Sequence, residues 1–116
     1  MQTALIALDS KQLITILRKM LEGLGFSCIS VETVEQLVNS MSEKQPSILF
    51  TDWYFSGEKA EDFLPKISSD SKVVFVSGEK SIQSIQRALD LGADEYIMKP
   101  FDNDILQSKL SLVGLL

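Results

Sequence analysis

The chain of 116 residues contains no histidine and only one cysteine, Cys28. The absence of histidine excludes Ser-His-Asp and Cys-His catalysis and removes the commonest zinc ligand. A single cysteine excludes an internal disulfide, and we interpret Cys28 as a small core residue of a protein from a reducing compartment. Any chemistry in this chain therefore depends on carboxylates, hydroxyl groups and lysine.

Long hydrophobic runs and clusters of basic residues are also missing. No apolar stretch approaches the roughly 18 residues needed to cross a bilayer, and the N-terminus lacks the basic start and cleavage site of a secretory signal. The net charge of −5, without a cluster of Lys and Arg, argues against direct binding of nucleic acid, which requires a cationic surface. We therefore expect a cytoplasmic protein that contacts neither a membrane nor nucleic acid directly.

What the sequence does contain is a regular alternation of two hydrophobic patterns. Five short apolar runs indicate β-strands, at residues 4–8, 26–31, 47–51, 72–76 and 95–98. After each run, apolar residues recur three or four positions apart, which is typical of amphipathic helices. Residues that can cap a helix precede four of these segments: Ser10, Thr33, Ser81 and Asp102. The alternation predicts an α/β fold, a doubly wound parallel sheet in a single domain of residues 1–116.

Polar residues follow four of the five predicted strands: Asp9, Asp52, Ser77 and Lys99. Each one alone has a structural interpretation as a turn or capping residue, but ligands of a doubly wound sheet bind beyond the carboxyl ends of its strands. Two adjacent carboxylates repel each other unless a cation lies between them, and oxygen ligands suit Mg²⁺ or Mn²⁺. A hydroxyl and a lysine add a donor and a positive charge for the oxygens of a phosphoryl group. The set predicts a divalent-metal site at which Asp52 is the nucleophile and forms an acyl phosphate.

Four segments carry a resemblance to a known family: "LDSKQ" (8–12), "ILFTDWYFSG" (48–57), "VVFVSG" (73–78) and "LGADEYIMKPF" (91–101). With these motifs the chain resembles, over essentially all of its length, the receiver domain of bacterial two-component response regulators, the CheY-like family. The resemblance implies a flavodoxin-like sheet of five strands in the order 2-1-3-4-5, with five helices. It also implies a phosphoacceptor that is phosphorylated by a histidine kinase or a phosphotransfer protein, with autophosphatase activity a further expectation, rather than a conventional metabolic enzyme.

The resemblance assigns roles to individual residues. It implies that Mg²⁺ is held by two carboxylates and one backbone carbonyl, those of Asp9, Asp52 and Tyr54. Two side chains would bind the phosphoryl oxygens, Ser77 and Lys99, and the Lys99-Pro100 bond is expected to be cis. Tyr96 would change rotamer when Ser77 moves toward the phosphate. Phosphorylation would thereby alter the surface of the fourth helix, fifth strand and fifth helix, which binds a partner or a second copy.

Two departures from the family pattern affect the predicted site. Leu8 stands where the family usually has a second acid beside Asp9, so we expect weaker Mg²⁺ binding and slower phosphoryl transfer. The usual Met-Pro-Gly-x-Asp-Gly after the acceptor reads Phe55-Ser56-Gly57-Glu58-Lys59-Ala60, so the loop is expected to be reshaped. An alternative therefore stays open, a pseudo-receiver that binds proteins without being phosphorylated.

Two other classes with a doubly wound sheet are disfavoured. A flavodoxin needs a glycine-containing phosphate loop after the first strand, and "DSKQLIT" has no glycine. A phosphatase of the haloacid dehalogenase type needs an Asp-x-Asp pair there, and Asp9-Ser10-Lys11 lacks the second acid. The C-terminal "LSLVGLL" is more apolar than a lone surface helix needs, through Leu112, Val113, Leu115 and Leu116. This favours a dimer or partner surface, or an output domain that follows.

Overall fold

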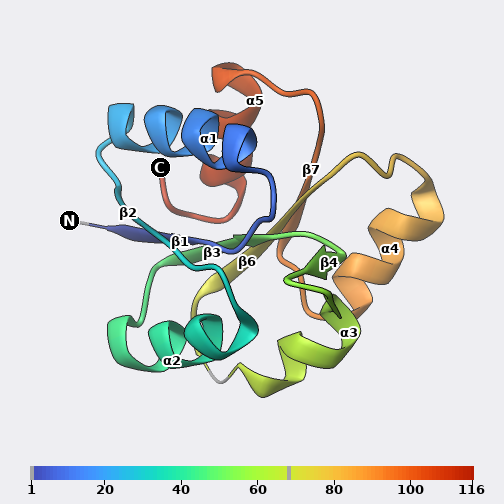
Figure 1. The fold of residues 1–116 in the computed structure, drawn as a ribbon. Helices are drawn as coiled ribbons and strands as arrows, with labels where there is room; N and C mark the ends of the chain where they lie inside the picture. Colours follow the sequence, from blue (N-terminus) through green and yellow to red (C-terminus); the bar gives the residue numbers. More distant parts are fainter. Residues whose placement is uncertain (1, 68) are drawn as a thin grey trace.

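A five-stranded parallel sheet forms the centre of the computed structural model, which describes residues 2–67 and 69–116 (Figure 1). Its strand order is β2-β1-β3-β6-β7, which corresponds to the expected order 2-1-3-4-5. The strands are β1 (Thr3–Ile6), β2 (Ser27–Ser30), β3 (Ile48–Thr51), β6 (Lys72–Ser77) and β7 (Glu95–Met98). All neighbouring pairs are parallel, so the carboxyl ends of the strands meet at one edge.

Helices cover both faces of the sheet (Figure 1). One face carries α1 (Lys11–Gly23) and α5 (Asn103–Leu112), and the other carries α2 (Val34–Lys44), α3 (Ala60–Phe63) and α4 (Ile82–Asp90). A separate hydrophobic cluster lies on each face, with Leu17 and Leu106 in the first and Leu37 and Phe63 in the second. Every residue of β3 is buried because this central strand contributes side chains to both clusters.

All four predicted helix caps are confirmed. The side-chain oxygens of Ser10, Thr33, Ser81 and Asp102 each accept a hydrogen bond from the backbone amide three residues later, over 2.9–3.2 Å. Such a bond satisfies one of the amides that a helix start leaves unpaired. The caps therefore fix where α1, α2, α4 and α5 begin, immediately after the segments that leave the sheet.

The region after β3 contains the largest difference from the sequence-based expectation. The reshaped loop is a small hairpin, with β4 (Tyr54–Phe55) antiparallel to β5 (Glu58–Lys59). Its two central residues both have positive φ, 53° at Ser56 and 78° at Gly57, as a tight hairpin turn requires. The α3 helix that follows is short and continues as a 3₁₀ turn over Leu64–Lys66, because Pro65 has no amide hydrogen for the helical ladder.

The C-terminal apolar residues divide into two groups. Helix α5 ends at Leu112, and beyond it Val113 and Leu115 pack against the α1 and α5 cluster. Leu112 and Leu116 stay largely exposed, so only half of the apolar surplus expected at this end is available to a partner.

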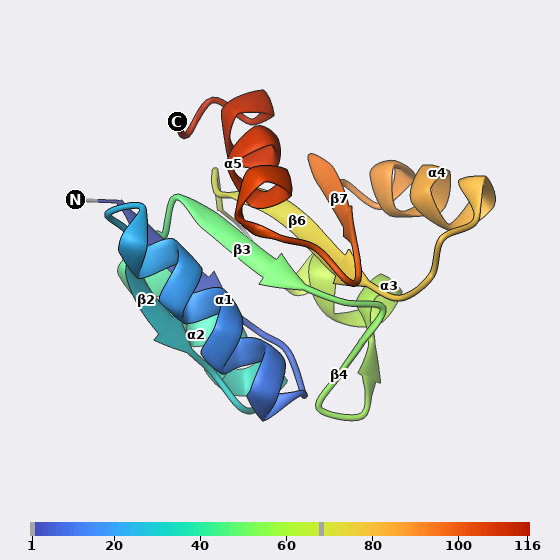
Figure 2. The same ribbon diagram turned by 90° about the horizontal axis from the view of Figure 1, so that it is seen from above.

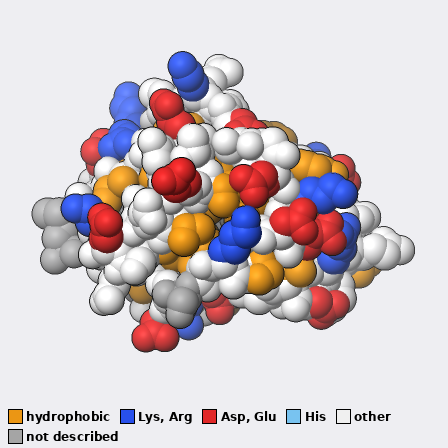
Figure 3. Space-filling view, turned by 60° about the horizontal axis from the view of Figure 1, so that its bottom comes forward, with side chains coloured by type: hydrophobic (Ala, Val, Ile, Leu, Met, Phe, Trp, Pro, Cys, Tyr) orange, Lys and Arg blue, Asp and Glu red, His pale blue; other side chains and the backbone are white. Residues whose placement is uncertain are grey.

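The surface of the described residues offers neither a membrane-spanning segment nor, on the face shown, a broad basic area. No helix formed by residues 2–67 or 69–116 has the length and apolar character required to span a membrane. Acidic and basic side chains alternate with small hydrophobic patches on the face drawn in Figure 3.

Candidate functional site

The polar residues predicted at the strand ends lie at the carboxyl edge of the sheet, the edge toward which the strand arrows point in Figure 2. Asp52 directly follows β3, Ser77 is the last residue of β6, and Lys99 directly follows β7. Main-chain bonds fix these positions, since the amide of Lys99 donates to the carbonyl of Ser77 over 2.8 Å. Asp9 lies in the connection between β1 and α1, at the same edge.

Asp52 is the central group of this edge. Its Oδ1 accepts a hydrogen bond from the Trp53 amide over 2.7 Å, and its Oδ2 lies 3.9 Å from the Lys99 ammonium nitrogen. Burial raises the pKa of the Asp52 carboxyl, although the Trp53 amide, the Ser77 hydroxyl and the Lys99 charge act in the opposite direction. The negative charge of Asp9 also raises this pKa, in the direction expected for a second acid at the same edge of the sheet.

Ser77 and Lys99 border the Asp52 carboxylate on the β6 and β7 side. Only 2% of Ser77 is exposed, and its Oγ accepts a hydrogen bond from the Glu79 amide over 3.2 Å. The Lys99-Pro100 peptide bond is cis, as expected. A buried hydroxyl and an ammonium group beside a carboxylate form a site that attracts negatively charged oxygens.

The Asp9 side of the site has fewer polar groups than the side formed by Ser77 and Lys99. Asp9 is exposed, and its Oδ1 accepts a hydrogen bond from the Ser56 amide over 2.9 Å. The Ala60 amide donates to the Trp53 carbonyl over 2.8 Å. In an antiparallel pair of strands, bonded and non-bonded residue pairs alternate, so the neighbouring pair, Tyr54 and Lys59, shares no backbone hydrogen bond. The Tyr54 carbonyl is therefore not used by the hairpin ladder.

These oxygen ligands suit Mg²⁺ better than a metal whose ligands all come from the protein. Among residues 2–67 and 69–116 there is no group of three or more His, Cys, Asp or Glu side chains that could hold a metal. Mg²⁺ is commonly bound by one or two carboxylates and completes its octahedron with water and phosphate oxygens. The carboxylates of Asp9 and Asp52, with the Tyr54 carbonyl outside the hairpin ladder, are oxygen ligands of that kind.

Leu8 supplies no second acid beside Asp9. Its side chain is 4% exposed and belongs to the hydrophobic cluster beneath α1 and α5. The residue therefore contributes to the core, and the Asp9 side of the site lacks one carboxylate relative to the family pattern.

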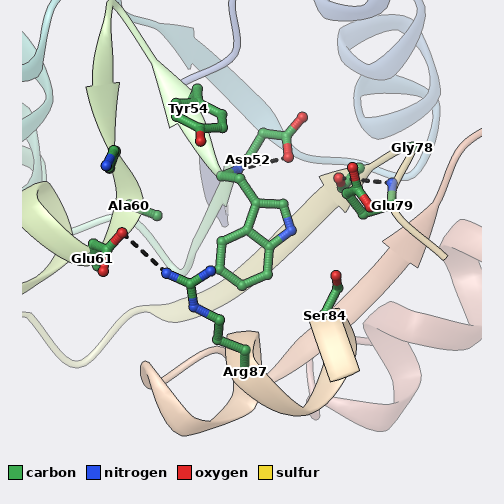
Figure 4. A pocket seen from close by; sticks show the side chains of 11 residues that line it. Asp52, Tyr54, Ala60, Glu61, Gly78, Glu79, Ser84 and Arg87 are labelled. Carbon is green, nitrogen blue, oxygen red and sulfur yellow. Dashed lines mark hydrogen bonds and ion pairs between the residues drawn. The ribbon is translucent and has the colours of Figure 1, made fainter. Parts of the chain in front are cut away.

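A cavity of 390 Å³ opens beside Asp52 between the β4–β5 hairpin, α3 and α4 (Figure 4). Arg87 of α4 extends across it to Glu61 of α3, with a 3.0 Å ion pair between Nη2 and Oε1. The Arg87 guanidinium also lies over the Trp53 ring, 5.2 Å from its centroid. One wall of the cavity is therefore held by side chains from two helices, α3 and α4, and from the connection between β3 and β4.

Tyr96 points inward and connects this wall to the β6–α4 segment. It is 3% exposed, and its hydroxyl donates to the Glu79 carbonyl over 2.9 Å while accepting from Trp53 Nε1 over 3.2 Å. Tyr96 was predicted from the sequence, whereas the parts that Glu61 and Arg87 play in this wall were not. No local pattern could reveal them, because the ion pair joins two residues that lie 26 positions apart, in different helices.

Comparison with known proteins agrees with the geometry. The family model of the response regulator receiver domain matches residues 4–111. The phosphate regulon transcriptional regulatory protein PhoB of Escherichia coli K12 is 29% identical over 98 residues, 80% of this chain and 43% of PhoB. The chain thus spans less than half of the length of that relative. Chemotaxis protein CheY1 of Helicobacter pylori strain 26695 is 29% identical over 119 residues, covering 94% of both proteins.

Solved structures show the same fold. A two-component response regulator from Clostridium difficile has a TM-score of 0.86 at 24% identity, covering 97% of this chain and 96% of that one. The receiver domain of a sensor histidine kinase from Pseudomonas aeruginosa, solved with a magnesium ion in its active site cleft, has a TM-score of 0.81 at 20% identity, covering 97% and 98%. The family match over residues 4–111, together with this architecture, means that the chain belongs to the response regulator receiver domain family of two-component signalling.

Proposed function

We propose that this receiver domain accepts a phosphoryl group on Asp52 from a histidine kinase or a phosphotransfer protein. The observation that carries the proposal is the position of the Asp52 carboxylate, 3.9 Å from the Lys99 ammonium and beside the buried Ser77 hydroxyl. An acid with these neighbours can attack phosphorus while the neighbours bind the oxygens of the phosphoryl group.

The transfer is a displacement at phosphorus. A carboxylate oxygen of Asp52 forms the new P–O bond as the P–N bond to the donor histidine breaks, and the electron pair of that bond leaves on the imidazole nitrogen. The product is an acyl phosphate on Asp52. The Trp53 amide holds the carboxylate through Oδ1, while Lys99 and Ser77 stabilise the charge on the transferred oxygens.

Mg²⁺, or Mn²⁺ with the same preference for oxygen, would be held by Asp9, Asp52 and the Tyr54 carbonyl. When bound, the cation offsets the combined negative charge of two carboxylates and a phosphoryl group. The magnesium-containing receiver structure from Pseudomonas aeruginosa supports this assignment by its shared fold. Because Leu8 is in the core, we expect weaker cation binding than two acids at positions 8 and 9 would give.

Phosphorylation would be transmitted through the β6–α4 segment. If the Ser77 hydroxyl turns toward a phosphoryl group, it loses its hydrogen bond from the Glu79 amide. Because the Tyr96 hydroxyl donates to the Glu79 carbonyl, a movement of Glu79 would also affect Tyr96. The surface of α4, β7 and α5 would then change. Exposed apolar residues support this surface as the site of a downstream partner, an output domain or a second copy: Leu89, Met98 and Ile105.

The second candidate is a pseudo-receiver that binds proteins without phosphorylation. One observation favours it, since Leu8 packs in the core and supplies no second acid beside Asp9. This alternative predicts that the fold is kept while Mg²⁺ and phosphoryl mimics have no effect on it.

Trp53 fluorescence separates the two candidates, because the indole contacts the cavity wall beside Asp52. We expect a saturable change when Mg²⁺ is titrated, and a further change with beryllofluoride, which imitates a phosphoryl group on a carboxylate. Both changes should be lost in Asp52→Asn. Unchanged fluorescence of the wild-type chain at millimolar Mg²⁺ with beryllofluoride would favour the pseudo-receiver.

A further inference from the structure

The tip of the β4–β5 hairpin contacts Asp9 through its backbone. The Ser56 amide donates to Asp9 Oδ1 over 2.9 Å, although the two residues are 47 positions apart. The acceptor is a carboxylate, and hydrogen bonds to charged acceptors are stronger than those between neutral groups. The contact therefore ties the hairpin to the acid that we propose as a metal ligand.

This contact depends on which residue occupies position 56. Ser56 stands where the usual family pattern has proline, and proline has no backbone N–H to donate. The φ of Ser56 is 53°, whereas the ring of proline fixes φ near −65°. Proline at this position would allow neither the hydrogen bond nor the hairpin turn.

The contact between Ser56 and Asp9 matters for cation binding because position 8 holds a leucine. An acid at position 8 would help to orient the ligands of a bound cation, but Leu8 packs in the core. Partners of this kind orient the ligands of a metal and typically change its affinity about 10- to 100-fold. With Oδ1 of Asp9 held by Ser56, the carboxylate has less freedom to rotate, and Oδ2 is left for a cation.

We propose that the Ser56 amide is a positioning group for Asp9, and that the hairpin thereby compensates in part for the missing acid at position 8. This inference rests on the metal site of the proposed function. The coupling is reciprocal, so a cation bound at Asp9 stabilises the hairpin by the same factor by which the hairpin improves cation binding.

Two substitutions at one position provide the main test. Ser56→Pro removes both the amide hydrogen and the positive φ, whereas Ser56→Gly keeps both. Titration of Mg²⁺ followed by Trp53 fluorescence should show affinity about tenfold weaker in Ser56→Pro and within about twofold of wild type in Ser56→Gly. Thermal unfolding of both variants by circular dichroism verifies that each is folded at the titration temperature.

Amide hydrogen exchange tests the contact directly, and its response to Mg²⁺ is a measurement that a purely structural role of the hairpin would not change. In the metal-free chain, Asp9→Ala should speed exchange at Ser56, while the Ala60 amide, bound to the Trp53 carbonyl over 2.8 Å, keeps its protection. Mg²⁺ should slow exchange at Ser56 in the wild-type chain and leave it unchanged in Asp9→Ala.

Equal Mg²⁺ affinities of Ser56→Pro and Ser56→Gly would overturn the inference, as would unchanged Ser56 exchange in Asp9→Ala. Those results leave the proposed function intact so long as the wild-type chain binds Mg²⁺ and beryllofluoride. A wild-type chain that binds no Mg²⁺ overturns both the inference and the metal site on which it rests.

Discussion

The two sides of Asp52 are built in different ways. On one side, Ser77 and Lys99 sit at the ends of two paired strands, and the Lys99 amide is bound to the Ser77 carbonyl. On the other side, Asp9 is exposed in a connection after β1, and its Oδ1 accepts a hydrogen bond from the amide of a hairpin residue, Ser56. The side proposed to bind phosphoryl oxygens belongs to the sheet, whereas the side proposed to bind the cation depends on loops.

This difference explains where the chain departs from the family pattern. Strand ends are fixed by the ladder and by the packing of both sheet faces, so a change there would disturb the core. Connections tolerate change more readily, and the departures at Leu8 and Ser56 both fall on the Asp9 side. We therefore expect perturbations on the Lys99 side to have larger effects on phosphoryl transfer than perturbations on the Asp9 side.

The largest effect is expected from Lys99→Ala. Removing the ammonium group 3.9 Å from Asp52 should slow phosphorylation by a small phosphoryl donor about 100-fold, because a preorganised positive charge is lost. The rate is measured by mass spectrometry of the intact chain. Lys109→Ala is the matched control, since Lys109 pairs with Glu95 over 2.9 Å and should leave the rate within about twofold. Similar rates for both variants would remove Lys99 from the mechanism.

On the Asp9 side, Leu8→Asp should strengthen Mg²⁺ binding by about tenfold. The same substitution places a carboxylate at a position that is 4% exposed, so the chain should also unfold at a lower temperature. Leu8→Asn has similar size without the charge and should lose stability without gaining affinity. Titration of Mg²⁺ by Trp53 fluorescence checks the first expectation, and equal affinities of the two variants would contradict it.

Behind both sides, Trp53→Phe should lower the free energy of unfolding by about 1 kcal/mol, because the Nε1 hydrogen bond to the Tyr96 hydroxyl is lost. Urea unfolding followed by circular dichroism measures it, since the substitution removes the fluorophore. The double variant Trp53→Phe with Tyr96→Phe tests the contact itself. The two single effects should sum to more than the double effect, and strict additivity would show that the hydrogen bond contributes nothing.

The smallest expected effect is a pH dependence of stability. Burial raises the pKa of Asp52 in the folded chain, so the folded state binds this proton more tightly than the unfolded state does. The associated stability is present below the pKa of the unfolded state and is lost as pH rises through the folded pKa. Thermal unfolding should therefore show Asp52→Asn gaining stability relative to wild type as pH increases, and a constant difference across that range would contradict the burial argument.

Most of the fold could be predicted from the sequence because local patterns determine it. The apolar runs located the five strands of the main sheet, and Ser10, Thr33, Ser81 and Asp102 marked helix starts that the structure confirms. The short α3 follows from Pro65, whose effect on the helix the spacing of apolar residues does not reveal. The hairpin was missed because its strands have two residues each, too few to show alternation, although Ser56-Gly57 is a suitable turn sequence.

The candidate site was predictable to the extent that it lies on strand ends. Topology alone brings Asp52, Ser77 and Lys99 together once the strand order is known. The pairing of Arg87 with Glu61 and the contact between Ser56 and Asp9 depend on how helices and a hairpin pack in three dimensions. No periodic pattern in the sequence encodes those approaches.

Phosphorylation of Asp52 is the central claim, and mass spectrometry of the intact chain tests it most directly. After incubation with Mg²⁺ and a small phosphoryl donor such as acetyl phosphate, the wild-type chain should gain the mass of one phosphoryl group, and borohydride reduction should locate it at Asp52. Asp52→Asn should gain none. A wild-type chain that stays unmodified, or an Asp52→Asn chain that is modified equally, would contradict the account.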